Sequence, residues 1–200
     1  MEMKQFLEDS EYINWKHPDI SKLAKDLAIN KESDTEIARA CFEWVHDNIK
    51  HSWDYKLNPV TCVASDVLQH GTGYCYAKSH LLAALLRANN IPTGLCYQRL
   101  SINNDGAPYS LHGLNAVYLK RRGWYRVDAR GNKEGVDAQF TPPVEQLAFP
   151  INEENEKDFP DILAEPVQVV VDVLTTQATV KEVFENLPDA EKLYCFKSGQ

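Results

Sequence analysis

Three residues whose types cooperate in nucleophilic catalysis are Cys75, His112 and Asp128. Cys75 lies in the segment GTGYCYAKSH, after a glycine-rich turn and at the start of a strongly helical run. Glycines permit a tight entry turn, and the free N–H groups and dipole of a helix start stabilise a thiolate. The same N–H groups can bond an oxyanion that forms on a substrate carbonyl. The pattern favours a nucleophilic thiol; the alternative is a small buried residue, as expected for Cys41 and Cys96.

A cysteine nucleophile needs a base, and the base needs an orienting group. Among the six histidines, His80 lies about 140° from Cys75 around the helix axis, which is poor geometry for direct contact. His112 opens the apolar strand HGLNAVYL, and the next strand, GWYRVDARGN, ends in Asp128. A hairpin around residues 120–123 brings both side chains to one open end, facing each other across the strand pair. We expect Asp128 to hold the imidazole of His112 while the other ring nitrogen takes the thiol proton.

The composition is that of an ordinary globular chain of 200 residues, 44% hydrophobic and 25% charged, which is enough apolar material for a full core. Its 29 acidic and 21 basic residues give a net charge of −8, so we expect no nucleic-acid partner. The N-terminal segment lacks an apolar signal region, and no apolar run approaches the ~20 residues of a membrane span, so we expect no membrane partner. Five cysteines at irregular spacing indicate reduced thiols and a cytoplasmic protein.

Two other kinds of site fail on spacing. Lys78 follows a glycine-rich segment, but Ala77 stands where a phosphate-binding P-loop requires glycine. Cys75, His80 and His112 lack the usual spacing of zinc ligands. We therefore expect no metal and no cofactor.

The order of the elements predicts an α+β fold. Apolar residues at three- and four-residue steps predict helices, and short aromatic and β-branched runs between turns predict strands. Helices are expected at 21–29, 33–51, 64–71, 75–90 and 179–187, with a helical turn at 143–149. Strands are expected at 93–100, 111–120, 123–129 and 166–174. Helices followed by strands favour an antiparallel sheet over alternating β and α units.

Three segments together resemble the transglutaminase-like superfamily of papain-type fold: GTGYCYAKSHLLAALLRANNIP, LHGLNAVYL and GWYRVDARGN. Bacterial members of that family combine a G-x-G-x-C helix start, ending in R-x-x-x-I-P, with a histidine-bearing strand and a G-W-x-x-x-D strand. The resemblance spans about residues 53–132. It implies N-terminal helices and a nucleophile at a helix start, packed on an antiparallel sheet. It also implies acyl transfer through a thioester, with Cys75 as nucleophile, His112 as base and Asp128 as orienter.

The resemblance also indicates where substrate contacts lie. Many members carry an aromatic residue two positions after the histidine, where this chain has Leu114. The family often supplies an aromatic oxyanion donor upstream of the nucleophile, in the region of Trp53 and Tyr55. Gln69 stands at the offset of the oxyanion glutamine in papain-like proteases. The expected substrate-binding residues are Trp53, Tyr55, Gln69, Tyr74, Tyr76 and Asn115.

We expect one domain over residues 1–200, with a helical part at 1–52, a motif core at 53–132 and a strand-and-helix extension at 133–200. The expected activity is that of a cysteine-dependent amide hydrolase or acyltransferase, similar to a peptidase or amidase. Its substrate would be a peptide, a protein or a small amide, with water or an amine as acyl acceptor. The alternative is a non-catalytic module of the same fold that binds a peptide or protein. The sequence leaves the oligomeric state open.

Overall fold

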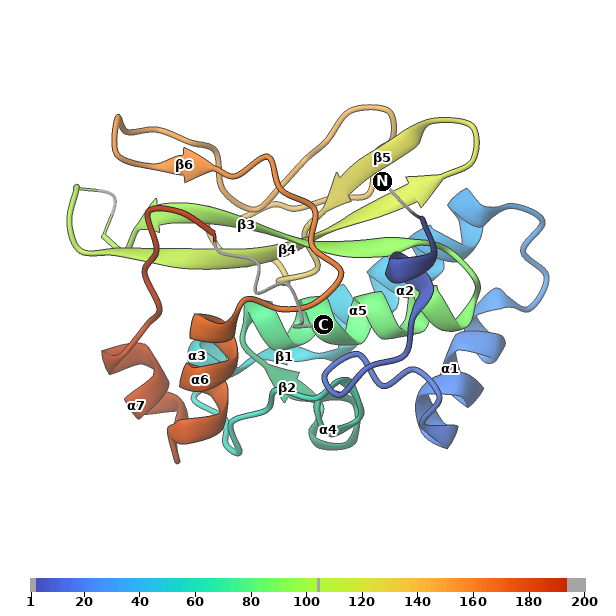
Figure 1. The fold of residues 1–200 in the computed structure, drawn as a ribbon, viewed down its shortest axis with the longest axis horizontal. Coiled ribbons are helices and arrows are strands. Elements are labelled where there is room, and N and C mark those ends of the chain that lie inside the picture. Colours follow the sequence, from blue (N-terminus) through green and yellow to red (C-terminus); the bar gives the residue numbers. More distant parts are fainter. Residues whose placement is uncertain (1–2, 104, 194–200) are drawn as a thin grey trace, which may run out of the picture.

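The computed structural model describes residues 3–103 and 105–193. Figure 1 shows the long helix α5 with an antiparallel sheet along one side and α4, β1 and β2 on the other. The elements are the 3-10 helix η1 (Met3–Leu7), α1 (Pro18–Ala28), α2 (Asp34–Asn48), β1 (Lys50–His51), α3 (Ser52–Tyr55), α4 (Ala64–His70), β2 (Thr72–Gly73), α5 (Cys75–Ala88), β3 (Thr93–Ser101), β4 (Tyr109–Leu119), β5 (Gly123–Val127), β6 (Lys157–Asp158), α6 (Gln168–Thr176) and α7 (Val180–Glu185). The predicted α+β fold is confirmed.

The sheet has the strand order β5-β4-β3-β6, and all of its neighbouring strands are antiparallel. β3 and β4 pair from Thr93 with Val117 to Ser101 with Tyr109. The hairpin expected around residues 120–123 is present, because β5 starts directly after that turn. The two long strands β3 and β4 therefore lie in the middle of the sheet, and β4 runs past the start of α5.

Helix α5 is buried along almost its whole length, from Cys75 to Arg87. Its composition, CYAKSHLLAALLRA, is apolar on nearly every side, which is typical of a helix covered all round rather than on one face. The sheet covers one side, and α1, α2 and α4 pack on the others. No helix within residues 3–103 and 105–193 is long and apolar enough to cross a membrane.

Arg87 joins three distant segments at the far end of α5. Its side chain is almost fully buried, and Nε and Nη2 donate to the carbonyl of Thr93 at 3.1 and 3.0 Å. Nη1 donates to the carbonyl of Glu8 at 2.9 Å, and Nη2 also donates to Ala164. Since a guanidinium carries five N–H donors in a fixed geometry, one side chain satisfies carbonyl groups from the N-terminal, central and C-terminal parts of the chain.

The strand predicted over 166–174 is wrong, because these residues form α6 instead. The buried residues recur at three- and four-residue steps, which suits one helix face: they are the N-cap Val167 and, within α6, Val170, Val171 and Leu174. β-branched residues favour strands only weakly, and packing of this face overrides the preference. The helical turn predicted over 143–149 is also wrong, since Gln146 there forms an isolated β-bridge with Gln139.

The C-terminal part of the described chain returns to the end of the molecule where α5 starts (Figure 1). Helix α7 begins as predicted, with Thr179 and Glu182 forming a capping box. After α7, Asp189 binds the guanidinium of Arg99 on β3 through two hydrogen bonds of 2.6 and 2.7 Å. The backbone N–H of Leu111 donates to the carbonyl of Pro188 at 2.7 Å. This segment is therefore fixed to the sheet and forms one wall beside the helix start.

Candidate active site

Cys75 is the first residue of α5, and the chain enters the helix from the short strand β2. Gly71, before that strand, has a φ of +65°, which glycine adopts without strain. A Cβ at Gly73 would lie 3.1 Å from the Cβ of Ala77 and 3.2 Å from Oγ1 of Thr61. The two glycines predicted to shape the turn therefore do so for different reasons, one through its backbone angles and one through lack of space.

Strand β4 passes directly over the start of α5. A Cβ at Gly113 would lie 2.9 Å from Cδ1 and 3.1 Å from Cα of Tyr76, so only glycine allows this approach. The N–H of Gly113 points at Sγ of Cys75, 3.5 Å away. Because His112 precedes this glycine, the same close approach brings its ring near the thiol, where Cys75 helps to raise the pKa of the imidazole.

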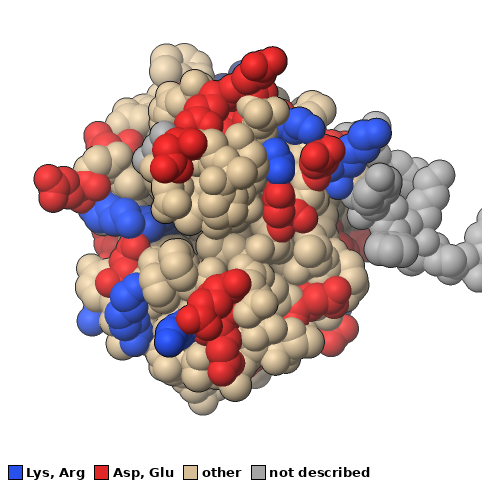
Figure 2. Space-filling model, turned by 90° about the vertical axis from the view of Figure 1, so that its left-hand side faces the viewer, with Lys and Arg blue, Asp and Glu red and all other residues tan. Residues whose placement is uncertain are grey.

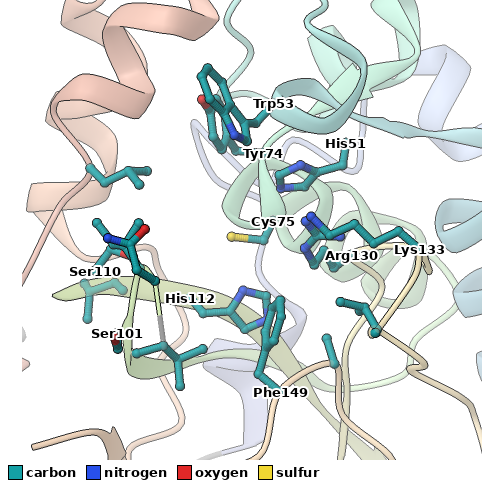
Figure 3. A pocket seen from close by; sticks show the side chains of 18 of the residues that line it. His51, Trp53, Tyr74, Cys75, Ser101, Ser110, His112, Arg130, Lys133 and Phe149 are labelled. Atoms are coloured by element: carbon teal, nitrogen blue, oxygen red, sulfur yellow. The ribbon is translucent and has the colours of Figure 1, made fainter. Parts of the chain in front are cut away.

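His112 and Asp128 form a buried pair, with Nε2 of the ring 2.6 Å from Oδ2 of the carboxylate. Asp128 is fixed by two further donors, since Oδ1 accepts the N–H of Arg130 at 3.1 Å and Oδ2 accepts the N–H of Ala148 at 3.2 Å. With Nε2 bound to the carboxylate, Nδ1 is the nitrogen left to face Cys75. The structure thus brings the three predicted catalytic side chains close together, and Figure 3 shows two of them, Cys75 and His112, at the groove.

The pair is held in its charged form. Burial alone lowers the pKa of His112, but the Asp128 carboxylate and the charge on Cys75 outweigh it and raise that pKa to about 10. Burial raises the pKa of Asp128, and the His112 cation together with the backbone N–H donors brings it below the ordinary value. An imidazolium between a carboxylate and a sulfur atom is the state that these neighbours favour.

The thiol lies in a groove of about 790 Å³. One wall is apolar, where the indole of Trp53 stacks on Phe184 with ring centroids 3.7 Å apart and planes 2° apart. Arg130 and Lys133 line the groove as cations, and both bind Asp54, at 2.8 and 2.9 Å. Figure 2 shows this end of the molecule, where charged side chains of both signs surround a largely uncharged centre.

The predicted substrate-binding residues divide into two groups. Trp53, Tyr74 and Tyr76 line the groove. The phenol groups of the two tyrosines also donate to backbone carbonyls, of Val180 and Leu111. Each therefore fixes a groove wall as well as facing the cavity.

The other three predicted residues lie outside the groove. Tyr55 is 60% exposed beside Lys50, and Gln69 is exposed on α4. Asn115 is fully buried and donates to the carbonyl of Ser79, so it joins β4 to α5.

Sequence reasoning missed His51 as a groove residue. It was expected at the end of a helix over 33–51, but that helix ends at Asn48 and His51 lies in β1, paired in parallel with Gly73 of β2. Its ring lines the groove beside Cys75. The only local signal is Asp54 three residues later, which has meaning only once the strand pair is known.

Two further features concern metals and thiols. Among residues 3–103 and 105–193, no group of three or more His, Cys, Asp and Glu side chains converges as a metal site would require. The cysteines described as free thiols are all buried: Cys41, Cys62, Cys75 and Cys96. Burial raises the pKa of Cys41, Cys62 and Cys96 to about 12. The fifth cysteine, Cys195, lies outside the described residues.

A cysteine at the first turn of a central helix, packed against an antiparallel sheet, defines the papain-like α+β class. Residues 21–129, more than half of the chain, match the model of the transglutaminase-like superfamily. The chain belongs to this superfamily. No curated protein matches it.

Several solved structures are similar to this chain. A candidate cysteine protease from Cytophaga hutchinsonii has 23% identity and a TM-score of 0.51, with 64% of this chain and 42% of that one covered. The periplasmic domain of TgpA from Pseudomonas aeruginosa, bound to ethylmercury, has 17% identity and a TM-score of 0.49, covering 64% and 48%. A TGase has 13% identity and a TM-score of 0.46, covering 92% and 54%. The chain therefore spans between two fifths and just over half of the length of these structures.

Proposed function

We propose that the protein is a cysteine-dependent amide hydrolase that works through a thioester on Cys75. The observation that carries this proposal is the buried arrangement in which His112 lies next to Gly113, whose N–H points at the Cys75 thiol, and binds Asp128 at 2.6 Å. A purely structural histidine does not need both a carboxylate and a thiol. Such an arrangement can move a proton between sulfur and a leaving group.

In the acylation step, the Cys75 thiolate attacks the carbonyl carbon of an amide. The first N–H groups of α5 have no partner within the helix, and they stabilise the oxyanion of the tetrahedral intermediate. The C–N bond then breaks as the His112 imidazolium gives its proton to the leaving amine. Asp128 keeps the ring oriented with Nδ1 toward the reaction throughout.

We propose water as the acyl acceptor, so that the products are a carboxylate and an amine. The groove is open, and its apolar wall at Trp53 and Phe184 suits an aromatic or aliphatic side chain of a peptide or small amide. The transglutaminase-like relatives leave an amine acceptor as the competing outcome, which the test must separate from hydrolysis.

The test is a screen with carboxamide and peptide substrates in ¹⁸O-labelled water, with and without an added primary amine. Hydrolysis predicts one labelled oxygen in the released carboxylate and little amine adduct, and Cys75→Ala serves as the blank. Preferential formation of the amine adduct would replace hydrolysis by transamidation. If no electrophile or amide in the screen reacts at Cys75, the binding module of the same fold becomes the better account.

A further inference from the structure

Two cations, Arg130 and Lys133, lie beside the catalytic thiol, and the acylation chemistry does not use them. Both come from the chain segment that follows the orienting Asp128, and both line the groove. Figure 3 shows them on one side of Cys75, whereas Ser110 lies on the other side. The groove is therefore asymmetric, with its positive charge gathered on one side of the reacting sulfur.

Arg130 is fixed close to the catalytic pair. It is 6% exposed, and its backbone N–H donates to Oδ1 of Asp128 at 3.1 Å. Its guanidinium lies over the ring of Phe149, 5.6 Å from the centroid. The same ring meets His112 edge-on, with centroids 5.0 Å apart. Arg130 therefore lies on the His112 side of the groove, where the leaving amine receives its proton.

The charge of the two cations is only partly balanced. One carboxylate, that of Asp54, binds Arg130 at 2.8 Å and Lys133 at 2.9 Å, and Nη1 of Arg130 donates to the carbonyl of Gly131 at 3.2 Å. A guanidinium carries five N–H donors and an ammonium three, so each cation has donors beyond those used in these contacts. One carboxylate between two cations leaves one positive charge in excess, and the His112 imidazolium adds another on this side.

Two carboxylates also line the groove, but neither cancels this charge. Glu134 is exposed, so water and salt screen its carboxylate. Glu156 is buried, and its carboxylate accepts the backbone N–H groups of Ser101 and Asn152 at 2.9 and 2.7 Å. Arg130 is nearly buried, and an ion pair with a desolvated guanidinium is stronger than one in water. A carboxylate of the substrate is therefore the group that suits this side of the groove.

We propose that Arg130 and Lys133 bind a carboxylate on the amine half of the substrate, an assignment that rests on the proposed function. The two side chains offer several charge-assisted N–H donors to one carboxylate. Arg130 and His112 contact the same Phe149 ring, and an extended chain advances about 3.3–3.6 Å per residue. The first or second residue after the scissile amide therefore brings the carboxylate to this position. The substrate releases an amine that carries either a C-terminal carboxylate or an acidic side chain.

The test is a competition between peptides that differ only after the scissile amide. Acetylated dipeptides with a varied first residue end in alanine with a free carboxylate, in alanine N-methylamide, or in aspartic acid amidated at its C-terminus. Mass spectrometry follows cleavage before the last residue, which gives the ratio of kcat/KM values in one reaction. We expect a carboxylate-bearing set to be cleaved about 10- to 10²-fold faster than the N-methylamide set, as for hydrogen bonds to a charged group. The set that is preferred identifies the source of the carboxylate, C-terminus or side chain.

Variants assign the preference to the two cations. Arg130→Gln is expected to lower the ratio about tenfold, and Lys133→Gln, at an exposed position, about threefold. Because the ratio compares substrates on the same molecules, partial misfolding of a variant does not change it. Lys181→Gln is the matched control, since Lys181 pairs with Glu185 at 3.5 Å on α7 and does not line the groove. It should keep the wild-type ratio.

A wild type that hydrolyses amides but cleaves all three sets within about twofold of one another, or cleaves none of them, would overturn the assignment and leave hydrolysis intact. A preference that stays unchanged in both Arg130→Gln and Lys133→Gln would overturn it as well. If the wild type hydrolyses no amide and Cys75 forms no thioester, the proposed function fails and the assignment fails with it.

Discussion

His112 and Asp128 meet at 2.6 Å although the hairpin does not place them opposite each other. The last pair of the β4–β5 ladder is Asn115 with Val127, so the two side chains lie on one face of the sheet and meet diagonally beyond the end of the ladder. Because Asp128 follows the last paired residue, its carboxylate is free to accept backbone N–H groups as well as the imidazole. The position of Asp128 just beyond the ladder thus allows it to orient the imidazole of His112.

Replacing Asp128 tests that orienting role. Asp128→Asn keeps the size of the side chain, but its amide can donate to Nε2 and place the ring proton on Nδ1, where it blocks proton transfer from the thiol. We expect kcat/KM for an amide substrate to fall on the order of 10³- to 10⁴-fold, as when a triad loses its correct tautomer. Asp172→Asn, at an exposed position on α6, is the matched control. A loss of less than about tenfold in kcat/KM for Asp128→Asn would contradict the role.

The two histidines that line the groove with Cys75 are expected to differ in charge at neutral pH, with His112 protonated and His51 neutral. The raised pKa of His112, about 10, keeps its ring protonated as the pH rises from 6.5, its ordinary pKa, toward 10. The lowered pKa of His51 keeps its ring neutral over the same interval. Ring ¹⁵N NMR with His51→Gln and His112→Gln for assignment measures both. Two rings that titrate together near 6.5 would refute this electrostatic account.

Gly113→Ala tests the close passage of β4 over α5. The added Cβ would lie within 3.1 Å of the backbone of Tyr76, which cannot give way cheaply, so β4 must move off the thiol. We expect a loss of about 1–3 kcal/mol in the free energy of unfolding, as for other overpacked sites, together with a larger loss of kcat/KM than in the control. That control is Gly94→Ala on β3, where a Cβ would clash with Cγ2 of Ile162 rather than with residues next to the thiol. Equal activity of the two variants per folded molecule would argue against the passage as a catalytic requirement.

Arg87→Lys is expected to lower the stability of the fold without changing the catalytic activity of the folded protein. A lysine cannot satisfy the carbonyl groups of Glu8, Thr93 and Ala164 together, and buried acceptors without partners are costly. We expect the free energy of unfolding in urea to fall by about 2–4 kcal/mol. Since Arg87 lies about 18 Å along the helix from Cys75, kcat/KM per folded molecule should not change. Arg39→Lys on the surface of α2 is the control and should lie within about 0.5 kcal/mol of the wild type; a similarly small change in Arg87→Lys would contradict the account.

Local patterns predicted the parts of the site that depend on neighbours in sequence. The glycines before Cys75 and the turn between β4 and β5 each affect only a few neighbouring residues, so their structural consequences could be predicted from the sequence. The strand predicted over 166–174 was wrong because the valines of this segment suit a strand as well as a helix, and only packing decides between the two.

Features that depend on pairing between distant segments could not be predicted. His51 reaches the groove because two residues of β1 pair with two residues of β2. Strands of two residues are too short to produce a recognisable pattern in the sequence. Asn115 was expected to face substrate, but the face of β4 on which it lies packs against α5. That orientation follows from the register of the sheet rather than from the residue type.

Activation of the Cys75 thiol is measured by its rate of iodoacetamide alkylation below pH 7, resolved by peptide mapping. Cys41, Cys62 and Cys96 are internal controls, because burial raises their pKa to about 12. We expect fast labelling of Cys75 alone, and marked slowing of that labelling in His112→Ala. Labelling of Cys75 no faster than that of a free thiol, and unchanged in His112→Ala, would contradict the activation of Cys75.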